Sequence, residues 1–398
     1  MAASFRSAEV IVVGLGALGA ACLYQLARAG VPALGVDRFA PPHDRGSSHG
    51  ETRITRRALG EGADYAPLAA RSHEIWRELE AATGETLMLA CGVLNLGPPD
   101  SRARMHGVAD FVGEAARVAA LHDVPHELVD AGEIRRRWPA MTPREDERGC
   151  FEPGGGVVFP ERCIAAQLYE AQRLGALALL DETVLAIEPQ GSGVCVRTSR
   201  GELGAARAIV AAGAWLPGLA GGWTRRLELR PQAVHWFAPS DPSQFTPDRF
   251  PVFIWLHGEG AEGGFYGFPI VPGAPTRAVK LATEHARSIG SPDGLDHAAA
   301  AQSGAGVWRD HVEGRIGGLR AGPVKSIACL YTVSPDSDFA IGPMQDAPQI
   351  TLASACSGHG FKHSAALGER LARQAAGEAV EMPAAFDPGR FAALRPRA

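Results

Sequence analysis

The 398-residue chain contains very little lysine. Of its 39 lysines and arginines, only Lys280, Lys325 and Lys362 are lysines. An ammonium group is compact and can lose its proton, whereas a guanidinium group stays charged. The residues around each lysine must therefore indicate whether the ammonium group has a function at that position.

The sequence also lacks a block of basic residues, and its formal net charge is −5. This composition excludes the electrostatic footprint of a nucleic-acid-binding protein. Its seven cysteines are an odd number without framework spacing, which favours a reducing, cytoplasmic setting. Cys356 and His359 form one close pair of metal-ligand types, and no second close pair accompanies them, so we expect no metal site.

Long uninterrupted apolar runs and internal repeats are absent as well. The run "VIVVGLGALGAACLYQLA" contains three glycines and ends at the charged "RAG", which argues against a membrane span or a signal segment. With 46% hydrophobic residues, the chain has enough apolar material for sizeable cores. We therefore expect a globular protein of two closely packed domains.

Pieces of one nucleotide-binding domain occur at the start, middle and end of the chain. The start predicts a strand over 10–13, a helix over 17–29 and a strand over 33–36. "ELGAARAIVAAGAW" reads as a strand that ends on small residues, and "QITLASACSGHGFKHSAALGERLARQAAG" repeats the order strand, glycine turn, helix. The expected domains are a nucleotide-binding domain of 1–90, 151–227 and 329–398, and a substrate domain of 91–150 and 228–328.

The first glycine turn has the spacing of a dinucleotide fingerprint. Gly14 allows a tight turn, Gly16 lets the backbone approach a pyrophosphate, and Gly19 lets the helix pack on the strand. The helix N-terminus, with Ala17 and Leu18, faces the anion. Asp37, 23 residues after Gly14, is placed to bind a ribose hydroxyl.

The fingerprint alone does not separate NAD from FAD. The second glycine turn favours FAD, because a flavin gains negative charge on reduction and a helix N-terminus stabilises that charge. Gly358, His359, Gly360 and Lys362 crowd this second terminus.

The chain resembles the flavin amine oxidases of the monomeric sarcosine oxidase and N-methyl-L-tryptophan oxidase group. The resemblance runs from end to end and is carried by "VIVVGLGALG", "PPHDRGSSHGETRITR", "GEGADYAPLAARSHEIW", "CGVLNLGP", "FEPGGGVVF", "AIVAAGAW", "FYGFP", "ACLYTVSPDSDF" and "SGHGFKHS". It implies an α/β fold with a Rossmann-like FAD domain and a second, mixed-sheet domain. It further implies a monomeric enzyme that oxidises an N-methyl amino acid, releases formaldehyde and passes the electrons to O2, giving hydrogen peroxide.

The resemblance also implies roles for single residues. Cys329 matches the cysteine that holds FAD covalently, and Tyr331 and Tyr266 match the walls of the substrate pocket. Arg56 and Lys362 match the pair that binds the substrate carboxylate. The catalytic residues implied are Lys280, which would activate O2, together with Arg53 and Tyr331. Further FAD contacts are expected from Arg38, Ser47, Ser48, His49, Arg53, Val184, Gly213, Gly358, His359, Gly360 and Lys362.

Two positions depart from the family pattern. Four residues after Lys280, where sarcosine-type members carry a histidine, this chain has Glu284, followed by His285. Neighbouring residues of a strand face opposite ways, so the sequence leaves open which of the two enters the pocket. Glu284 or His285 is also a candidate catalytic residue, as the base that keeps the substrate amine unprotonated. Leu59 stands where relatives often have an aromatic residue.

Other functions stay open at this stage. Within the flavin enzymes, a deaminating or cyclic imino-acid oxidase or dehydrogenase is the alternative. Outside them are an NAD-dependent dehydrogenase and a non-catalytic flavoprotein subunit that binds FAD for a partner.

Overall fold

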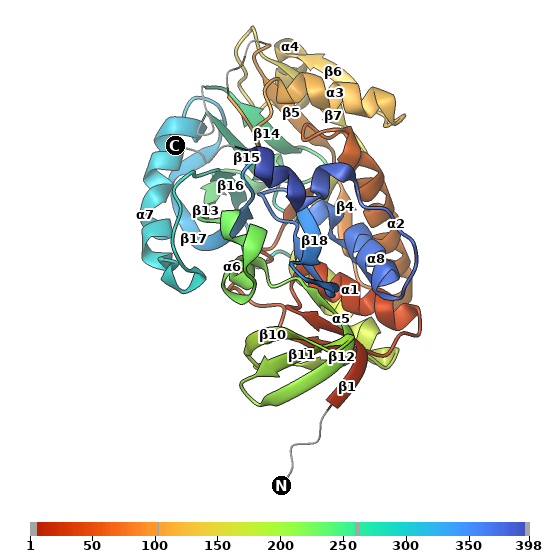
Figure 1. Ribbon diagram of the computed structural model, residues 1–398. Coiled ribbons are helices and arrows are strands. Elements are labelled where there is room, and N and C mark those ends of the chain that lie inside the picture. The colour runs from red at the N-terminus through yellow and green to blue at the C-terminus, as the bar shows by residue number, and fades with distance from the viewer. Residues whose placement is uncertain (1–5, 100, 102, 259–262, 395–398) are drawn as a thin grey trace.

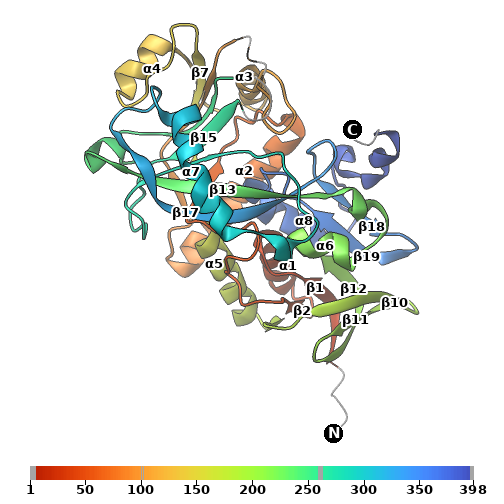
Figure 2. The same ribbon diagram turned by 90° about the vertical axis from the view of Figure 1, so that its left-hand side faces the viewer.

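Two large β-sheets, each flanked by helices, form the frame of the protein (Figures 1 and 2). The computed structural model describes residues 6–99, 101, 103–258 and 263–394. Within this part of the chain, no helix combines the length and the apolar character needed to cross a bilayer.

The first sheet collects strands from three distant parts of the chain. Its main path runs β10-β11-β12-β1-β2-β9, and β19 pairs with both β12 and β18. The strands are β1 (Arg6–Val13), β2 (Ala33–Val36), β9 (Leu177–Leu179), β10 (Val184–Gln190), β11 (Gly193–Thr198), β12 (Gly201–Val210), β18 (Ala340–Met344) and β19 (Ala347–Ser354).

The centre of this sheet is parallel. β1 pairs in parallel with β2 and β12, and β12 pairs in parallel with β19. Val13 lies opposite both Val36 and Val210, so these strands end at the same edge. In an open α/β sheet, this carboxyl edge is where ligands bind.

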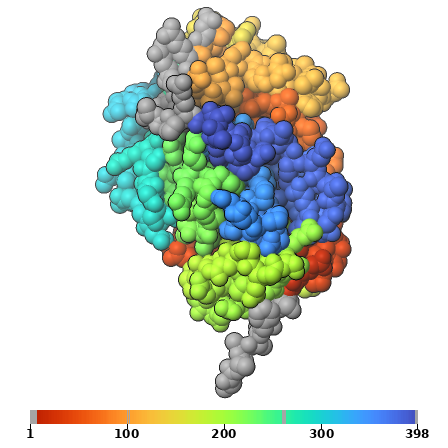
Figure 3. Space-filling view, viewed as in Figure 1, coloured from red at the N-terminus to blue at the C-terminus, as the bar shows by residue number. Residues whose placement is uncertain are grey.

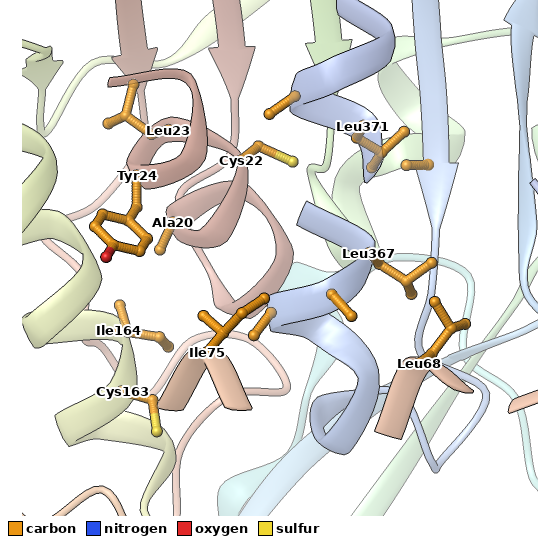
Figure 4. Packing of buried hydrophobic residues seen from close by; sticks show 14 of the residues in the cluster. Ala20, Cys22, Leu23, Tyr24, Leu68, Ile75, Cys163, Ile164, Leu367 and Leu371 are labelled. Carbon is orange, nitrogen blue, oxygen red and sulfur yellow. The ribbon is translucent and has the colours of Figure 1, made fainter. Parts of the chain in front are cut away.

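Helices α1 (Ala17–Arg28), α2 (Ala66–Thr83), α5 (Pro160–Arg173) and α8 (Ser364–Ala375) contribute to one hydrophobic core with this sheet. Figure 4 shows Cys22 of α1 beside Leu371 of α8, and Ala20 and Tyr24 on the side of α5. The approach of α1 to α8 is close because Gly368 has no side chain; a Cβ there would lie 2.4 Å from the Cβ of Ala21.

The second sheet runs β17-β13-β16-β15-β14-β5-β7-β6. Its strands are β5 (Val93–Gly97), β6 (Glu127–Asp130), β7 (Arg148–Glu152), β13 (Glu228–Pro239), β14 (Val252–Leu256), β15 (Gly264–Phe268), β16 (Val279–Thr283) and β17 (Leu319–Val333). Helix α7 (His297–Val307) packs on β13 and β17, and α3 (Phe111–Leu121) and α4 (Ala131–Arg137) lie at the β5-β7-β6 end.

A small sheet, β3-β8-β4, comprises β3 (Arg53–Thr55), β4 (Met88–Ala90) and β8 (Gly156–Val158), and the short helix α6 (Leu216–Leu219) follows β12. Figure 3 shows the C-terminal segment, in blue, between orange segments above it and yellow-green segments below it. The strand orders of the two large sheets show that each is assembled from segments that are distant in sequence.

The predicted elements agree with this structure. The expected strands over 10–13 and 33–36 lie in β1 and β2, the helix over 17–29 is α1, and the C-terminal strand and helix are β19 and α8. The domain limits stay a prediction, and β17 runs across the limit expected at residue 328.

Gly368→Ala should lower the free energy of unfolding by about 1–3 kcal/mol, because the added methyl group overpacks the contact between α1 and α8. Urea unfolding of the FAD-loaded protein measures this. The matched control is Gly290→Ala, where nothing lies within 4 Å of an added Cβ. Equal stability of the two variants would contradict the close approach of the helices.

Candidate active site

A cavity of about 400 Å³ opens at the carboxyl edge of the first sheet. It is lined by Val13 and Val36 at the ends of β1 and β2, by Ala211 just after β12, and by Ser354 at the end of β19. Its volume is within the usual range for cofactor sites. The cavity therefore lies where the parallel strands predict a ligand.

The first glycine turn forms one end of this cavity. Gly14 has a φ of +85°, which favours glycine, and a Cβ there would lie 2.7 Å from the carbonyl oxygen of Ala211. A Cβ on Gly19 would lie 1.7 Å from the carbonyl oxygen of Gly14, so only glycine lets α1 pack against the turn. Gly16, at the N-cap of α1, has no capping side chain, and the backbone N–H of Ala17 makes only a long hydrogen bond of 3.4 Å to Oγ of Ser48, so this helix end can receive a phosphate.

Asp37 directly follows β2 and lies beside this turn. Its Oδ2 accepts a hydrogen bond from the backbone N–H of Leu15 (2.6 Å), and its Oδ1 accepts one from that of Phe39 (2.9 Å). These bonds fix the carboxylate at the wall of the cavity, where it can also accept bonds from a ribose. The glycines, the uncapped helix and this acid together fit a dinucleotide such as FAD.

A second cavity of about 60 Å³ adjoins the first. Arg53, Tyr331, Gly358 and Phe361 line both, so the two spaces meet at these side chains. A cofactor in the large cavity would therefore present one end to the small one.

A buried group of charges forms one side of the small cavity. The Glu61 carboxylate lies 2.8 Å from Nη2 of Arg56 and 2.9 Å from Nζ of Lys362. The exposed fraction of each of the three side chains is 4% or less. Two cations that would otherwise repel each other thus converge on one carboxylate.

The pKa values reflect this arrangement. Burial raises the pKa of Glu61, but the nearby Arg56 and Lys362 outweigh burial and hold it well below its usual range. Burial lowers the pKa of Lys362 to about 8, although Glu61 opposes that shift. All three groups are therefore charged at neutral pH.

Opposite this group, Glu284 faces His106. Oε1 of Glu284 lies 2.7 Å from Nε2 of His106, and Nδ1 of the same ring lies 3.5 Å from Glu61. Glu284 lines the small cavity. His285 does not line it; its backbone N–H and C=O are bonded to the side chain of Gln232. The structure therefore places Glu284, and not His285, in the cavity.

Two tyrosines close another side. The hydroxyl groups of Tyr266, on β15, and Tyr331, on β17, lie 3.2 Å apart, and both residues line the small cavity. Cys329 is two residues before Tyr331 on β17 and is buried. Burial raises the pKa of its thiol, while the cations Arg53 and Lys280 oppose that shift. Another cysteine, Cys356, lines the large cavity.

Lys280 lies on β16 and holds the turn over residues 50–52. Its Nζ donates to the carbonyl oxygens of Gly50 (2.8 Å) and Thr52 (2.7 Å). Burial lowers the pKa of Lys280 well below its usual value, and Arg53 adds to this shift. Lys325 pairs with Glu51 of the same turn at 2.7 Å, although the sequence offered no site motif around it.

Most of the sequence-predicted residues meet at these cavities. Those lining the large cavity are Gly14, Gly16, Ala17, Leu18, Asp37, Arg38, Ser47, Ser48, Arg53, Val184, Gly213, Tyr331, Gly358 and Gly360. Those lining the small cavity are Arg53, Arg56, Tyr266, Glu284, Tyr331, Gly358, His359 and Lys362. The remaining predicted residues, all described, lie outside both linings: Gly19, His49, Lys280, His285 and Cys329.

Sequence reasoning missed Glu61 and His106. Glu61 lies in "GEGADY", close to Arg56 in sequence, so an acid near an expected carboxylate-binding arginine was a usable signal. His106 lies in "ARMHGV" and carries no motif. Only the folded chain brings it to Glu284. Leu59, the other departure, is fully buried in the core that includes α1 and α2 and does not line the small cavity.

Comparison with known proteins agrees with this geometry. The family described as "FAD dependent oxidoreductase" matches residues 9–374. The monomeric sarcosine oxidase of Streptomyces avermitilis is 36% identical over 97% of this chain and 98% of that protein. The N-methyl-L-tryptophan oxidase of Yersinia pestis is 33% identical over 97% of this chain and 99% of that protein.

A solved structure shares the fold. NikD, described as an unusual amino acid oxidase essential for nikkomycin biosynthesis, matches with a TM-score of 0.81 at 23% identity, covering 96% of this chain and 98% of that one. The chain belongs to the FAD-dependent oxidoreductase family and, within it, to the group of monomeric sarcosine oxidases and N-methyl-L-tryptophan oxidases. The predicted family, fold class and use of FAD are confirmed, and the chain is an enzyme of the amine-oxidising flavoproteins.

Glu61→Gln should destabilise the FAD-loaded protein by about 3–5 kcal/mol, because it leaves two buried cations without their carboxylate. The control is Glu114→Gln, which removes one partner of an exposed pair with Arg117 and should change stability little. The loss should shrink as the pH falls through the low pKa of Glu61, where the wild type also loses this charge. An unfolding curve for Glu61→Gln equal to that of the control would contradict a stabilising Glu61.

Proposed function

We propose that the protein is an oxidase of N-methyl amino acids of the sarcosine or N-methyltryptophan type, which yields the demethylated amino acid, formaldehyde and hydrogen peroxide. One observation carries this proposal: Arg56 and Lys362 converge on a carboxylate beside a cavity that fits FAD. That carboxylate belongs to Glu61, and the same two cations suit the carboxylate of an amino acid. The names of the relatives support the substrate type.

When bound, FAD supplies the acceptor for the electrons of the amine, so the protein needs no nucleophile of its own. The side chains must bind and orient the substrate. With its carboxylate near Arg56 and Lys362, the amine would extend toward Tyr331 and Gly358, where the two cavities meet.

The amine must lose its proton before it can be oxidised. Arg53, Arg56 and Lys362 all line the small cavity, and nearby cations lower the pKa of an ammonium group. Glu284 lines the same space and is the carboxylate available to accept that proton.

We assign the activation of O2 to Lys280. Its ammonium group is buried beneath the turn over residues 50–52, near Arg53. In its protonated form, Lys280 would stabilise the negative charge that O2 gains with its first electron. We further propose that the enzyme acts as a monomer in the cytoplasm, and its seven unpaired cysteines suit a reducing compartment.

An amine panel tests the function. We expect peroxide and formaldehyde in equal amounts from an N-methyl amino acid, and loss of at least about 100-fold in kcat/KM in Arg56→Gln, since a hydrogen bond between charged groups is lost. The panel should contain sarcosine, N-methyltryptophan, dimethylglycine, pipecolate and proline. Peroxide without formaldehyde would favour the cyclic imino-acid or deaminating alternative, and no bleaching of the flavin by any amine would favour the non-catalytic subunit.

We also propose that Cys329 holds FAD through a thioether. Cys329 lies outside both linings but is two residues before Tyr331 on β17, which lines both cavities, and Arg53 and Lys280 favour its thiolate. Cys356 is the natural comparison, because its side chain lines the large cavity directly.

Acid precipitation separates the two cysteines. The wild type and Cys356→Ser should carry yellow flavin into the pellet, whereas Cys329→Ser should leave it in the supernatant. Absorbance of the redissolved pellet measures the fraction retained. A tether at Cys356 would give the reverse pattern, and a colourless wild-type pellet would show that FAD is held without a covalent bond.

A further inference from the structure

Three side chains from different elements meet over Gly358. A Cβ on this glycine would lie 2.9 Å from Tyr331, 3.0 Å from Nε2 of His106 and 3.1 Å from Oε1 of Glu284. Gly358 has a φ of +85° and lines both cavities. The pair of His106 and Glu284 therefore forms the wall of the small cavity nearest to its junction with the large one.

We propose that His106 is a specificity-determining residue: with Glu284 it closes the substrate cavity and restricts the enzyme to small N-methyl amino acids that lack a cationic side chain. The proposal rests on the demethylating function proposed above. Within that function, His106 and Glu284 determine which substrates fit the small cavity.

The volume of the small cavity supports the restriction to small substrates. Its volume of about 60 Å³ is well below the roughly 300–1,000 Å³ of pockets for drug-sized ligands. A cavity this small favours sarcosine over N-methyltryptophan, which has more than twice as many non-hydrogen atoms. The imidazole of His106 lines this cavity, 2.7 Å from Glu284 and with its ring centre 6.3 Å from that of Phe111, so it takes up space that a larger substrate would need.

The charged side chains that line the small cavity support the exclusion of substrates with a cationic side chain. Glu284 alone would attract a cationic side chain, but His106 already contacts it at 2.7 Å. Burial lowers the pKa of His106, yet Glu284 and Glu61 outweigh burial and raise it to about 9, so the ring is charged at neutral pH. With Arg53, Arg56 and Lys362 also in the lining, positive groups outnumber the carboxylates Glu61 and Glu284.

This balance suits one substrate carboxylate and repels a second cation. His359, whose ring centre lies 4.8 Å from that of His106, adds no positive charge at neutral pH, because burial and then His106 hold the pKa of His359 well below its usual value. The enzyme thus discriminates against cationic substrates because His106 already occupies the position beside Glu284 that a cationic substrate group would take.

Three variants distinguish the effect of the size of the His106 side chain from the effect of its charge. His106→Ala removes the wall and exposes the charge of Glu284. His106→Gln keeps the size of the side chain and removes its charge. The double variant His106→Ala with Glu284→Gln opens the space without leaving a carboxylate. For each FAD-loaded protein, kcat/KM is measured with sarcosine, Nα-methyllysine and N-methyltryptophan.

The readout is the ratio of kcat/KM values within one preparation, which is unaffected by the fraction of protein that folds or binds FAD. The wild type should prefer sarcosine over both larger substrates. His106→Ala should shift the ratio toward Nα-methyllysine by at least about tenfold. His106→Gln should shift it in the same direction by less, and the double variant should gain N-methyltryptophan but not Nα-methyllysine.

Each contrary result has a distinct meaning. If the wild type demethylates sarcosine but the ratios stay within about twofold in all variants, the role of His106 is wrong and the proposed function stands. A wild type that prefers N-methyltryptophan or Nα-methyllysine over sarcosine also overturns the inference alone. If the wild type demethylates none of the three, the proposed function fails, and the inference that rests on it fails too.

Discussion

The buried carboxylate of Glu61 is the interaction on which the small cavity depends. It contacts Arg56, five residues before it in the chain, at 2.8 Å and Lys362, 301 residues after it, at 2.9 Å. Without it, two buried cations would face each other with no compensating charge, which is costly in a poorly solvated site. The same contact aligns the second glycine turn with β3, and so it sets the shape of the space beside the cofactor cavity.

The two cavities divide the chemistry between them. The large cavity is built mainly from backbone and small side chains at the carboxyl edge of a parallel sheet, which suits a cofactor shared by a whole family. The small cavity is built from charged and aromatic side chains that come from both large sheets and from loops. Differences in those side chains can therefore change the space and charge offered to a substrate while the cofactor cavity keeps its form.

Sequence reasoning reaches furthest where a function needs a local backbone shape. The spacing alone pointed to Gly14, Gly16 and Asp37, which all line the large cavity, because a tight turn and a helix N-terminus are made by neighbouring residues. It failed for His106, whose partner is Glu284 of a distant segment. It also left Glu284 and His285 undecided, since the facing of a residue just after β16 depends on where that strand stops pairing.

The sequence by itself determined the fold class, the glycine turns, the use of FAD and the family, because each is written in contiguous motifs or in the resemblance that those motifs carry. The tertiary structure alone decided that Glu61 fills the space between Arg56 and Lys362 and that Glu284, not His285, reaches the cavity. It also decided that His106 lies 2.7 Å from Glu284. These are contacts between segments far apart in the chain, and their energies depend on burial and distance, which exist only once the chain has folded.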